Sequence, residues 1–350
     1  MDTYSRILVR ATNWIGDAVM SLPALAAVRR RYPAAHIAVL ARPWVADLYR
    51  HEPFADEIIP YTPSRGLKRW QAAGRALRAK RFECAVLLQN AFDAAAVVRW
   101  AGIPRRIGYR RDGRGWLLTD AVPLPKPGSI PPHESYYYLE LLRRIGWVDA
   151  LPDAPKVRLE GADQAREAGR ARFDAEGLGT LIGVSPGAAY GSAKRWLAES
   201  FIEASARLAA ELRGTVALFG SAAESELCEF IRSELHRRGF HARSYAGATG
   251  LAEYIERAAA CRVYLTNDSG AMHIASALGV PTVAVFGSTN PVTTGPASES
   301  AIVMREEVEC SPCMLRECPF DHACMKAVTP QRVARAALDL LQREGSGHAV

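Results

Sequence analysis

Short apolar runs alternate along the chain with longer stretches in which apolar residues recur every three or four positions. Runs of roughly four to eight apolar residues are typical of buried strands, and the longer periodicity is typical of helices. In the first half this pattern predicts strands at residues 7–10, 36–40, 57–61, 84–88 and 106–109, and helices at 18–31, 67–80, 94–101 and 134–145. Such alternation favours a parallel sheet covered by helices.

The second half repeats the scheme after a proline-rich and glycine-rich stretch, residues 111–132, that is expected to be a loop. The predicted strands are 180–184, 215–219, 242–245, 263–265 and 282–286, and the predicted helices are 198–212, 224–237, 251–260, 330–343 and one that follows Asp268. We therefore expect an α/β protein with two Rossmann-like domains, residues 1–165 and 166–350. Such domains bind ligands beyond the carboxyl ends of their strands, here in the cleft between them.

Composition narrows the class of protein. The chain has 350 residues, of which 49% are hydrophobic and 23% charged, so it can bury substantial cores. No apolar run reaches the roughly 18 residues of a membrane span, and the amino terminus does not look like a signal peptide, so a cytoplasmic protein is expected. The net charge of +7 fits either an ordinary solvated surface or attraction to an anionic partner. No basic block interleaved with aromatic residues indicates a nucleic-acid partner.

The first turn that could carry chemistry is "NWIGDAV", at the end of the first strand. Asp17 stands where a helix begins, and Gly16 would let a ligand approach the backbone closely. Asp17 could simply cap the helix, or it could be a functional carboxylate. Since a helix amino terminus favours the charged form, we expect Asp17 to have a low pKa and to be a weak base.

The second turn, "PGAAYGSAKRW", resembles a phosphate-binding loop in its chemistry. Gly187 and Gly191 can expose backbone N–H groups to a phosphate, and Lys194 can neutralise a diphosphate. The pattern is neither GxGxxG nor a Walker A loop, so a plain surface loop remains an alternative.

The third turn, "TNDSGAMH", leads from a strand into a helix that starts at Ser269 and Gly270. The free N–H groups of that helix could face a ligand, and Asp268 would orient other groups or accept hydrogen bonds. His273 lies one turn further on, where a purely structural role is the alternative. Thr289 follows in a later loop of small residues, "FGSTNP".

Taken together, the three turns resemble those of the ADP-heptose:lipopolysaccharide heptosyltransferases, glycosyltransferase family 9, and most of all the heptosyltransferase II members. The resemblance implies the GT-B fold, with the acceptor on the first domain, ADP-heptose on the second, and no metal or other cofactor. It implies a catalytic base at Asp17 and charge neutralisation by Lys194. It further implies donor contacts at Gly187, Ser192, Lys194, Asp268, Ser269, Gly270, His273 and Thr289, and acceptor contacts at Asn13, Arg105 and Arg110.

The implied reaction is transfer of L-glycero-D-manno-heptose to the first heptose of the lipopolysaccharide inner core, heptosyl-Kdo2-lipid A, by an enzyme in peripheral contact with the inner membrane. Heptosyltransferase I or another core heptosyltransferase is the nearest alternative, and a non-catalytic two-domain sugar-binding protein is a remote one. A nucleotide-dependent dehydrogenase is disfavoured because no GxGxxG follows the first strand.

The sequence leaves the roles of one arginine cluster and one cysteine cluster undecided. Five arginines, Arg105, Arg106, Arg110, Arg111 and Arg114, could either be solvated or clamp the anionic acceptor. Four cysteines, Cys310, Cys313, Cys318 and Cys324, surround His322. They begin with a CxxC pair, but the later spacings do not repeat it, so we expect free thiols and retain a structural metal as the alternative.

Overall fold

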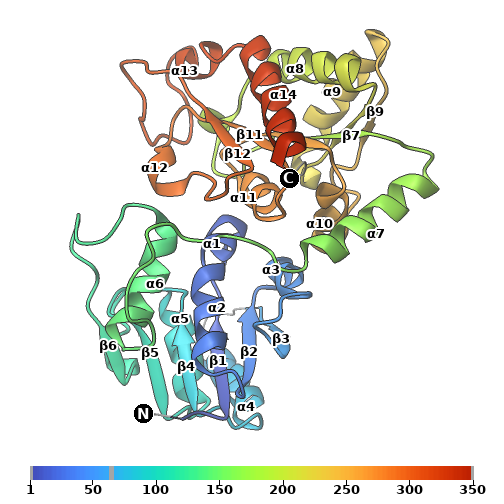
Figure 1. Cartoon of the computed structure of the whole chain (residues 1–350). Helices are drawn as coiled ribbons and strands as arrows, with labels where there is room; N and C mark the ends of the chain where they lie inside the picture. Colours follow the sequence, from blue (N-terminus) through green and yellow to red (C-terminus); the bar gives the residue numbers. More distant parts are fainter. Residues whose placement is uncertain (1–2, 63–66, 348–350) are drawn as a thin grey trace. The chain divides into compact units, whose positions relative to one another are not determined.

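The computed structural model describes residues 3–62 and 67–347. The chain divides into two compact units, Met1–Val157 and Arg158–Val350. Each unit, as far as it is described, holds a six-stranded sheet in which every neighbouring pair of strands is parallel (Figure 1). The α/β fold class expected from the sequence is confirmed.

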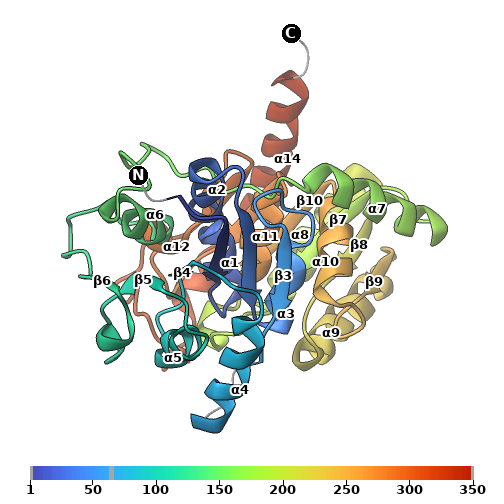
Figure 2. The same cartoon turned by 90° about the horizontal axis from the view of Figure 1, so that it is seen from below.

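The sheet of the first unit has the strand order β3-β2-β1-β4-β5-β6. The strands are β1 (Arg6–Arg10), β2 (His36–Ala41), β3 (Glu57–Pro60), β4 (Cys84–Leu87), β5 (Arg105–Tyr109) and β6 (Asp120–Val122). The main helices are α1 (Ile15–Met20), α2 (Leu22–Arg31), α3 (Pro43–Ala46), α4 (Leu67–Arg78), α5 (Phe92–Trp100) and α6 (Glu134–Arg144). Helices α2 and α6 pack together on one face of the sheet, and α4 and α5 on the other (Figure 2).

Two sequence predictions for this unit are wrong. The helix expected at 18–31 is two helices, because the chain turns at Ser21. Pro23 lies in the first turn of α2, where the missing N–H of a proline costs no helical hydrogen bond. The stretch 111–132 is not entirely loop, since β6 adds to the edge of the sheet beside β5. A three-residue edge strand shows no periodicity, so the sequence gives no signal for it.

The second unit has the order β12-β11-β10-β7-β8-β9. Its strands are β7 (Leu181–Ser185), β8 (Thr215–Leu218), β9 (Ala242–Ser244), β10 (Val263–Asn267), β11 (Thr282–Val285) and β12 (Ala301–Met304). Its helices are α7 (Ala162–Ala175), α8 (Ala198–Leu212), α9 (Ser225–Arg237), α10 (Leu251–Ala259), α11 (Gly270–Ala277), α12 (Pro291–Thr294), α13 (Ala323–Lys326) and α14 (Pro330–Gly347). Helix α8 packs against α9 and α14, and α10 against α7 and α11.

The units divide between Val157 and Arg158, whereas the sequence predicts a boundary after residue 165. That position lies inside α7, which packs along α10 and belongs to the second unit. The close packing depends on Gly169, where a Cβ would come within 1.9 Å of the Glu256 carbonyl oxygen.

Both sheets share one topological feature that determines where ligands can bind. In the first sheet, β1 to β3 are added in one direction from the centre, and β4 to β6 in the other. In the second sheet, β7 to β9 and β10 to β12 are likewise added in opposite directions. The crevice beyond the carboxyl ends of such central strands is the usual ligand site of open parallel sheets. The three turns singled out from the sequence follow β1, β7 and β10. No helix in the described part of the chain is long and apolar enough to cross a membrane.

Candidate functional site

Three side chains of the second unit converge at the carboxyl ends of its central strands. The Lys194 ammonium forms an ion pair with Asp268, with Nζ 2.6 Å from Oδ2. The Thr289 hydroxyl donates to the same oxygen at 2.5 Å. Asp268 follows β10, Lys194 ends the turn after β7, and Thr289 follows β11, so the sheet brings together residues far apart in the chain.

This cluster, Lys194–Asp268–Thr289, is largely shielded from water. The side chains of Lys194 and Asp268 are 14% and 5% exposed. An ammonium group has three donors, and the contact with Asp268 uses one of them. Asp268 therefore holds Lys194 in place, and the ammonium group has donors left that could contact an anionic ligand.

Asn267 holds the same site together and was missed from the sequence. Its side-chain oxygen accepts from the Trp196 backbone N–H at 2.8 Å, and its amide donates to the Pro186 carbonyl at 2.7 Å. The last residue of β10 thus fixes both ends of the loop after β7. The asparagine stands inside the quoted motif "TNDSG", so its polarity at the end of a buried strand was the available signal.

Glu224 is a second residue missed from the sequence. A Cβ at Gly187 would lie 1.7 Å from its Oε1, so any larger residue there would have to displace the Glu224 side chain. Glu224 also completes a capping box with Ser221, accepting from its backbone N–H at 2.7 Å. The spacing of a serine followed three residues later by glutamate could have identified it.

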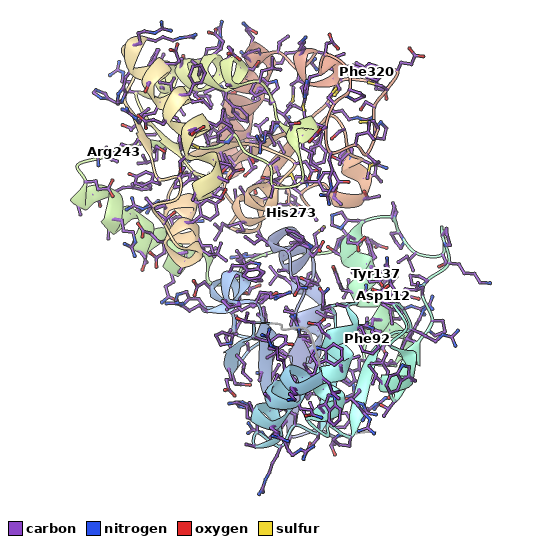
Figure 3. All side chains as sticks on the ribbon, turned by 180° about the vertical axis from the view of Figure 1, so that it is seen from behind. Phe92, Asp112, Tyr137, Arg243, His273 and Phe320 are labelled. Atoms are coloured by element: carbon purple, nitrogen blue, oxygen red, sulfur yellow. The ribbon has the colours of Figure 1, made fainter. Side chains whose placement is uncertain are left out.

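The remaining residues expected to bind the donor surround this cluster. Ser192 begins the short 3₁₀ turn that ends at Lys194. Ser269 precedes α11 without capping it through its side chain, and Gly270 is the first residue of that helix. His273 is buried one turn into α11 (Figure 3). The residues of the turns after β7 and β10 thus lie at the carboxyl ends of the strands of the second sheet.

The four clustered cysteines line a cavity of about 630 Å³ beside the same turns. Ala193 and Ser288 also line it, as does the exposed Phe320 (Figure 3). The backbone of this segment is tied to the turns, because the Met314 N–H donates to Ser288 and the Ala193 N–H to Arg316. All four thiols are free. Among the described residues, no three His, Cys, Asp or Glu side chains are arranged to share a metal ion.

In the first unit, Asp17 lies in the first turn of α1 rather than at its N-cap. The N-cap residue is Trp14, and no side chain caps the helix, so the interpretation of Asp17 as a cap is wrong. The expectation of a low pKa is also wrong, because burial raises the pKa of Asp17 above its usual value. A six-residue helix has a small dipole, and desolvation of the carboxylate outweighs it.

Glu134, the first residue of α6, is a second carboxyl group near Asp17. Burial raises its pKa, and the charge of Asp17 raises it further, while Arg111 acts in the opposite direction. Helices α1 and α6 pack together, which explains the interaction. Neither carboxyl group takes part in an ion pair of the described residues, unlike Asp56, which pairs with Arg29. These are two partly buried carboxylates of raised proton affinity.

The five arginines that could be either solvated or part of an anionic clamp separate into different environments. Arg105 stands at the amino end of β5, where it pairs with Asp120 and donates to the Tyr4 hydroxyl. Asp17 follows the carboxyl end of β1, so the two residues lie at opposite ends of the parallel strands. Arg106 donates to backbone carbonyls near it. Arg114 is fully buried and bonds to the Asn90 side chain and to backbone oxygens. Arg110 and Arg111 are exposed and directly follow β5. Arg111 pairs with Asp112 and interacts with Tyr137, and Figure 3 labels both of these partners.

Asn13 lies in the turn after β1, and its side-chain oxygen accepts hydrogen bonds from Arg10 and Arg42. Its own contacts are thus to arginines that converge beside the turn carrying Asp17.

The sequence profile of Glycosyltransferase family 9 (heptosyltransferase) matches residues 70–324. The chain belongs to this family. The lipopolysaccharide heptosyltransferase 2 of Salmonella typhimurium is 34% identical to this family 9 chain over 349 residues, 97% of the chain and 99% of the relative. The lipopolysaccharide heptosyltransferase 1 of Pseudomonas aeruginosa is 25% identical over 354 residues, 94% of the chain and 96% of the relative.

A solved structure, ADP-heptose lps heptosyltransferase II of E. coli, matches the family 9 chain with a TM-score of 0.82 and 32% identity. The match covers 97% of this chain and 99% of that one. The resemblance inferred from the three turns and the expected GT-B fold are confirmed. The protein is a glycosyltransferase, so the reading as a non-catalytic sugar-binding protein is excluded.

Proposed function

We propose that this glycosyltransferase transfers heptose from ADP-heptose to the first heptose of the lipopolysaccharide inner core. The observation that carries the proposal is the Lys194–Asp268–Thr289 cluster beside the amino end of α11, which its N-cap residue Ser269 does not cap through its side chain. A fixed cation and a helix amino terminus together suit the two phosphates of a nucleoside diphosphate sugar. The relatives named heptosyltransferase 2 support this donor and this acceptor.

In the proposed reaction, the hydroxyl of the acceptor attacks the anomeric carbon of the donor while Asp17 accepts its proton. The bond from that carbon to the phosphate oxygen breaks, and ADP leaves. Lys194 and the N–H groups of α11 offset the charge that develops on the phosphate, which is the electrostatic part of the rate gain. Because the step is a single displacement, we propose inversion at the anomeric carbon, with no metal required.

The raised pKa of Asp17 supports its role as the base. A carboxylate that is partly desolvated accepts a proton more readily than an exposed aspartate. Since the proposed acceptor is a glycolipid, we also propose that the enzyme works in peripheral contact with the cytoplasmic face of the inner membrane.

The test is to incubate the full-length protein and ADP-heptose with either heptosyl-Kdo2-lipid A or Kdo2-lipid A. Mass spectrometry then determines the masses of the products. Addition of one heptose to the first acceptor alone is expected. Addition to Kdo2-lipid A alone would instead make the protein a heptosyltransferase I, for which the lower identity to the Pseudomonas relative gives less support. No product with either acceptor would refute the proposal.

A further inference from the structure

Two arginines of the first unit converge on one neutral oxygen. Arg10 is the last residue of β1, and Arg42 directly follows β2, the neighbouring parallel strand (Figure 1). Arg10 Nη2 donates to Asn13 Oδ1 at 2.8 Å, and Arg42 Nε donates to the same atom at 3.1 Å. The asparagine therefore holds two guanidinium groups together without neutralising either.

No carboxylate forms an ion pair with Arg10 or Arg42 among the described residues. Elsewhere in the unit, arginines meet carboxylates directly, as Arg29 does with Asp56 and Arg105 with Asp120. Arg10 is fully buried. Burial lowers its pKa to about 10, against the attraction of Asp93, and the like charge of Arg42 acts in the same direction as burial. The pair is thus a concentration of positive charge without an ion pair in the described part of the chain, although Asp93 attracts Arg10 and Arg10 Nη1 donates to the Ala11 and Leu40 carbonyls.

Arg42 also stacks on an exposed aromatic side chain. Its guanidinium lies 5.0 Å from the ring centre of Trp44, and the indole N–H of Trp44 donates to the Asn13 carbonyl at 3.1 Å. Trp44 is 53% exposed, and Trp14, next to Asn13, is 71% exposed. An arginine fixed by stacking and by a side-chain acceptor loses little freedom on binding, and its planar fork suits a carboxylate or a phosphate.

We propose that Arg42, supported by Arg10 behind it and fixed by Asn13 and Trp44, binds an anionic group of the acceptor. The group is a sugar-acid carboxylate or a sugar phosphate. The proposal rests on the proposed function for the identity of the acceptor, and it places the anion site at the carboxyl ends of β1 and β2, beside the turn that carries Asp17. It also gives Asn13 a positioning role, since its oxygen faces the arginines.

The experiment compares wild type with Arg42→Gln in steady-state transfer. The KM for the acceptor should rise at least tenfold, while the KM for ADP-heptose stays within twofold. Arg31→Gln is the matched control, because Arg31 also stacks on an aromatic ring, Tyr32 at 5.4 Å, and has no ion pair in the described structure. It should behave as wild type. An acceptor KM within twofold of wild type for Arg42→Gln would overturn the proposal.

Two modified acceptors identify the anion. One lacks its phosphates, and the other carries esterified sugar-acid carboxyl groups. Wild type should lose affinity for one of them, and Arg42→Gln should no longer distinguish that one from the native acceptor. If the variant discriminates both as strongly as wild type does, Arg42 does not bind the anion. Circular dichroism checks that Arg42→Gln is folded. If it is not, Arg42→Lys is used instead, which keeps the charge but loses the planar guanidinium group. Its KM for the acceptor should rise at least threefold.

A binding measurement separates failure of this site from failure of the proposed function. Calorimetric titration of the full chain with inorganic phosphate and with the free sugar acid Kdo needs no turnover. If wild type transfers no heptose, the proposed function fails, but weaker anion binding by Arg42→Gln than by wild type still supports the site. Equal binding by the two proteins, or no binding to wild type, overturns it.

Discussion

Replacing Lys194 by methionine tests whether the ion pair with Asp268 is a buried structural element as well as a ligand contact. The change removes the ammonium 2.6 Å from a carboxylate that is only 5% exposed. Among its described contacts, Asp268 then keeps the hydroxyl of Thr289. Breaking a buried pair by removing one partner costs about 3–5 kcal/mol, since the other charge is left uncompensated.

We expect the low end of that range, about 3 kcal/mol, because water can reach the Lys194 side chain, which is 14% exposed. For a unit of roughly 150–250 residues, each kcal/mol shifts Tm by about 2–4 °C, so Tm should fall by roughly 6–12 °C. Differential scanning calorimetry of the full-length protein measures this. Adding Asp268→Asn to the variant should restore much of the Tm without restoring transfer, because the amide is neutral but the proposed diphosphate site still lacks its cation.

The matched control is Lys326→Met in the same unit. Lys326 pairs with Asp321 at 3.4 Å, and both side chains are exposed, at 51% and 68%. Such surface pairs contribute little because both charges stay solvated and screened, so Tm should shift by no more than roughly 4 °C. A Lys194→Met protein that melts no lower than this control would refute the reasoning, as would a double variant that melts lower than the single one.

Four further outcomes are expected. Asp17→Asn should lower kcat by on the order of 10²–10⁴-fold while ADP affinity by calorimetry stays unchanged; activity within a few-fold of wild type would rule out the base. Because burial raises the pKa of Asp17, the wild-type kcat/KM should fall on acidification at a pH above the ordinary aspartate pKa of about 3.9. The same burial means that the ionised carboxylate destabilises the fold, so Asp17→Asn should have a Tm at pH 7 no lower than that of wild type. Asp17→Asn should also lower the pKa of Glu134, measured by NMR titration of its carboxyl group, because the Asp17 charge that raises this pKa is removed; an unchanged pKa of Glu134 would contradict the interaction. Gly187→Ala should cost about 1–3 kcal/mol of unfolding free energy, measured by urea titration, because its Cβ would meet Glu224 at 1.7 Å, whereas Gly179→Ala, with nothing within 4 Å, is the control.

Regular elements and the turns between them were largely predictable from the chain. A buried parallel strand is a short apolar run, and a helix on its face repeats every three or four residues, so both patterns are local. Helix α8, Ala198–Leu212, has the predicted limits. Strand β6 and the break at Ser21 were not predictable, because an edge strand of three residues and a turn between two helices depend on what packs against them.

By itself the sequence determined that two parallel α/β units exist, that Asp17, Lys194 and Asp268 stand at strand ends, and which family the turns resemble. Tertiary structure alone decided which of these groups meet and in what charge state. It joined Lys194, Asp268 and Thr289, placed Arg105 at the opposite end of the parallel strands from Asp17, and assembled Arg10 and Arg42 on Asn13. The physical reason is that periodicity reflects burial, a local property, whereas pKa values and ion pairs depend on distances between residues that only the folded sheet brings close.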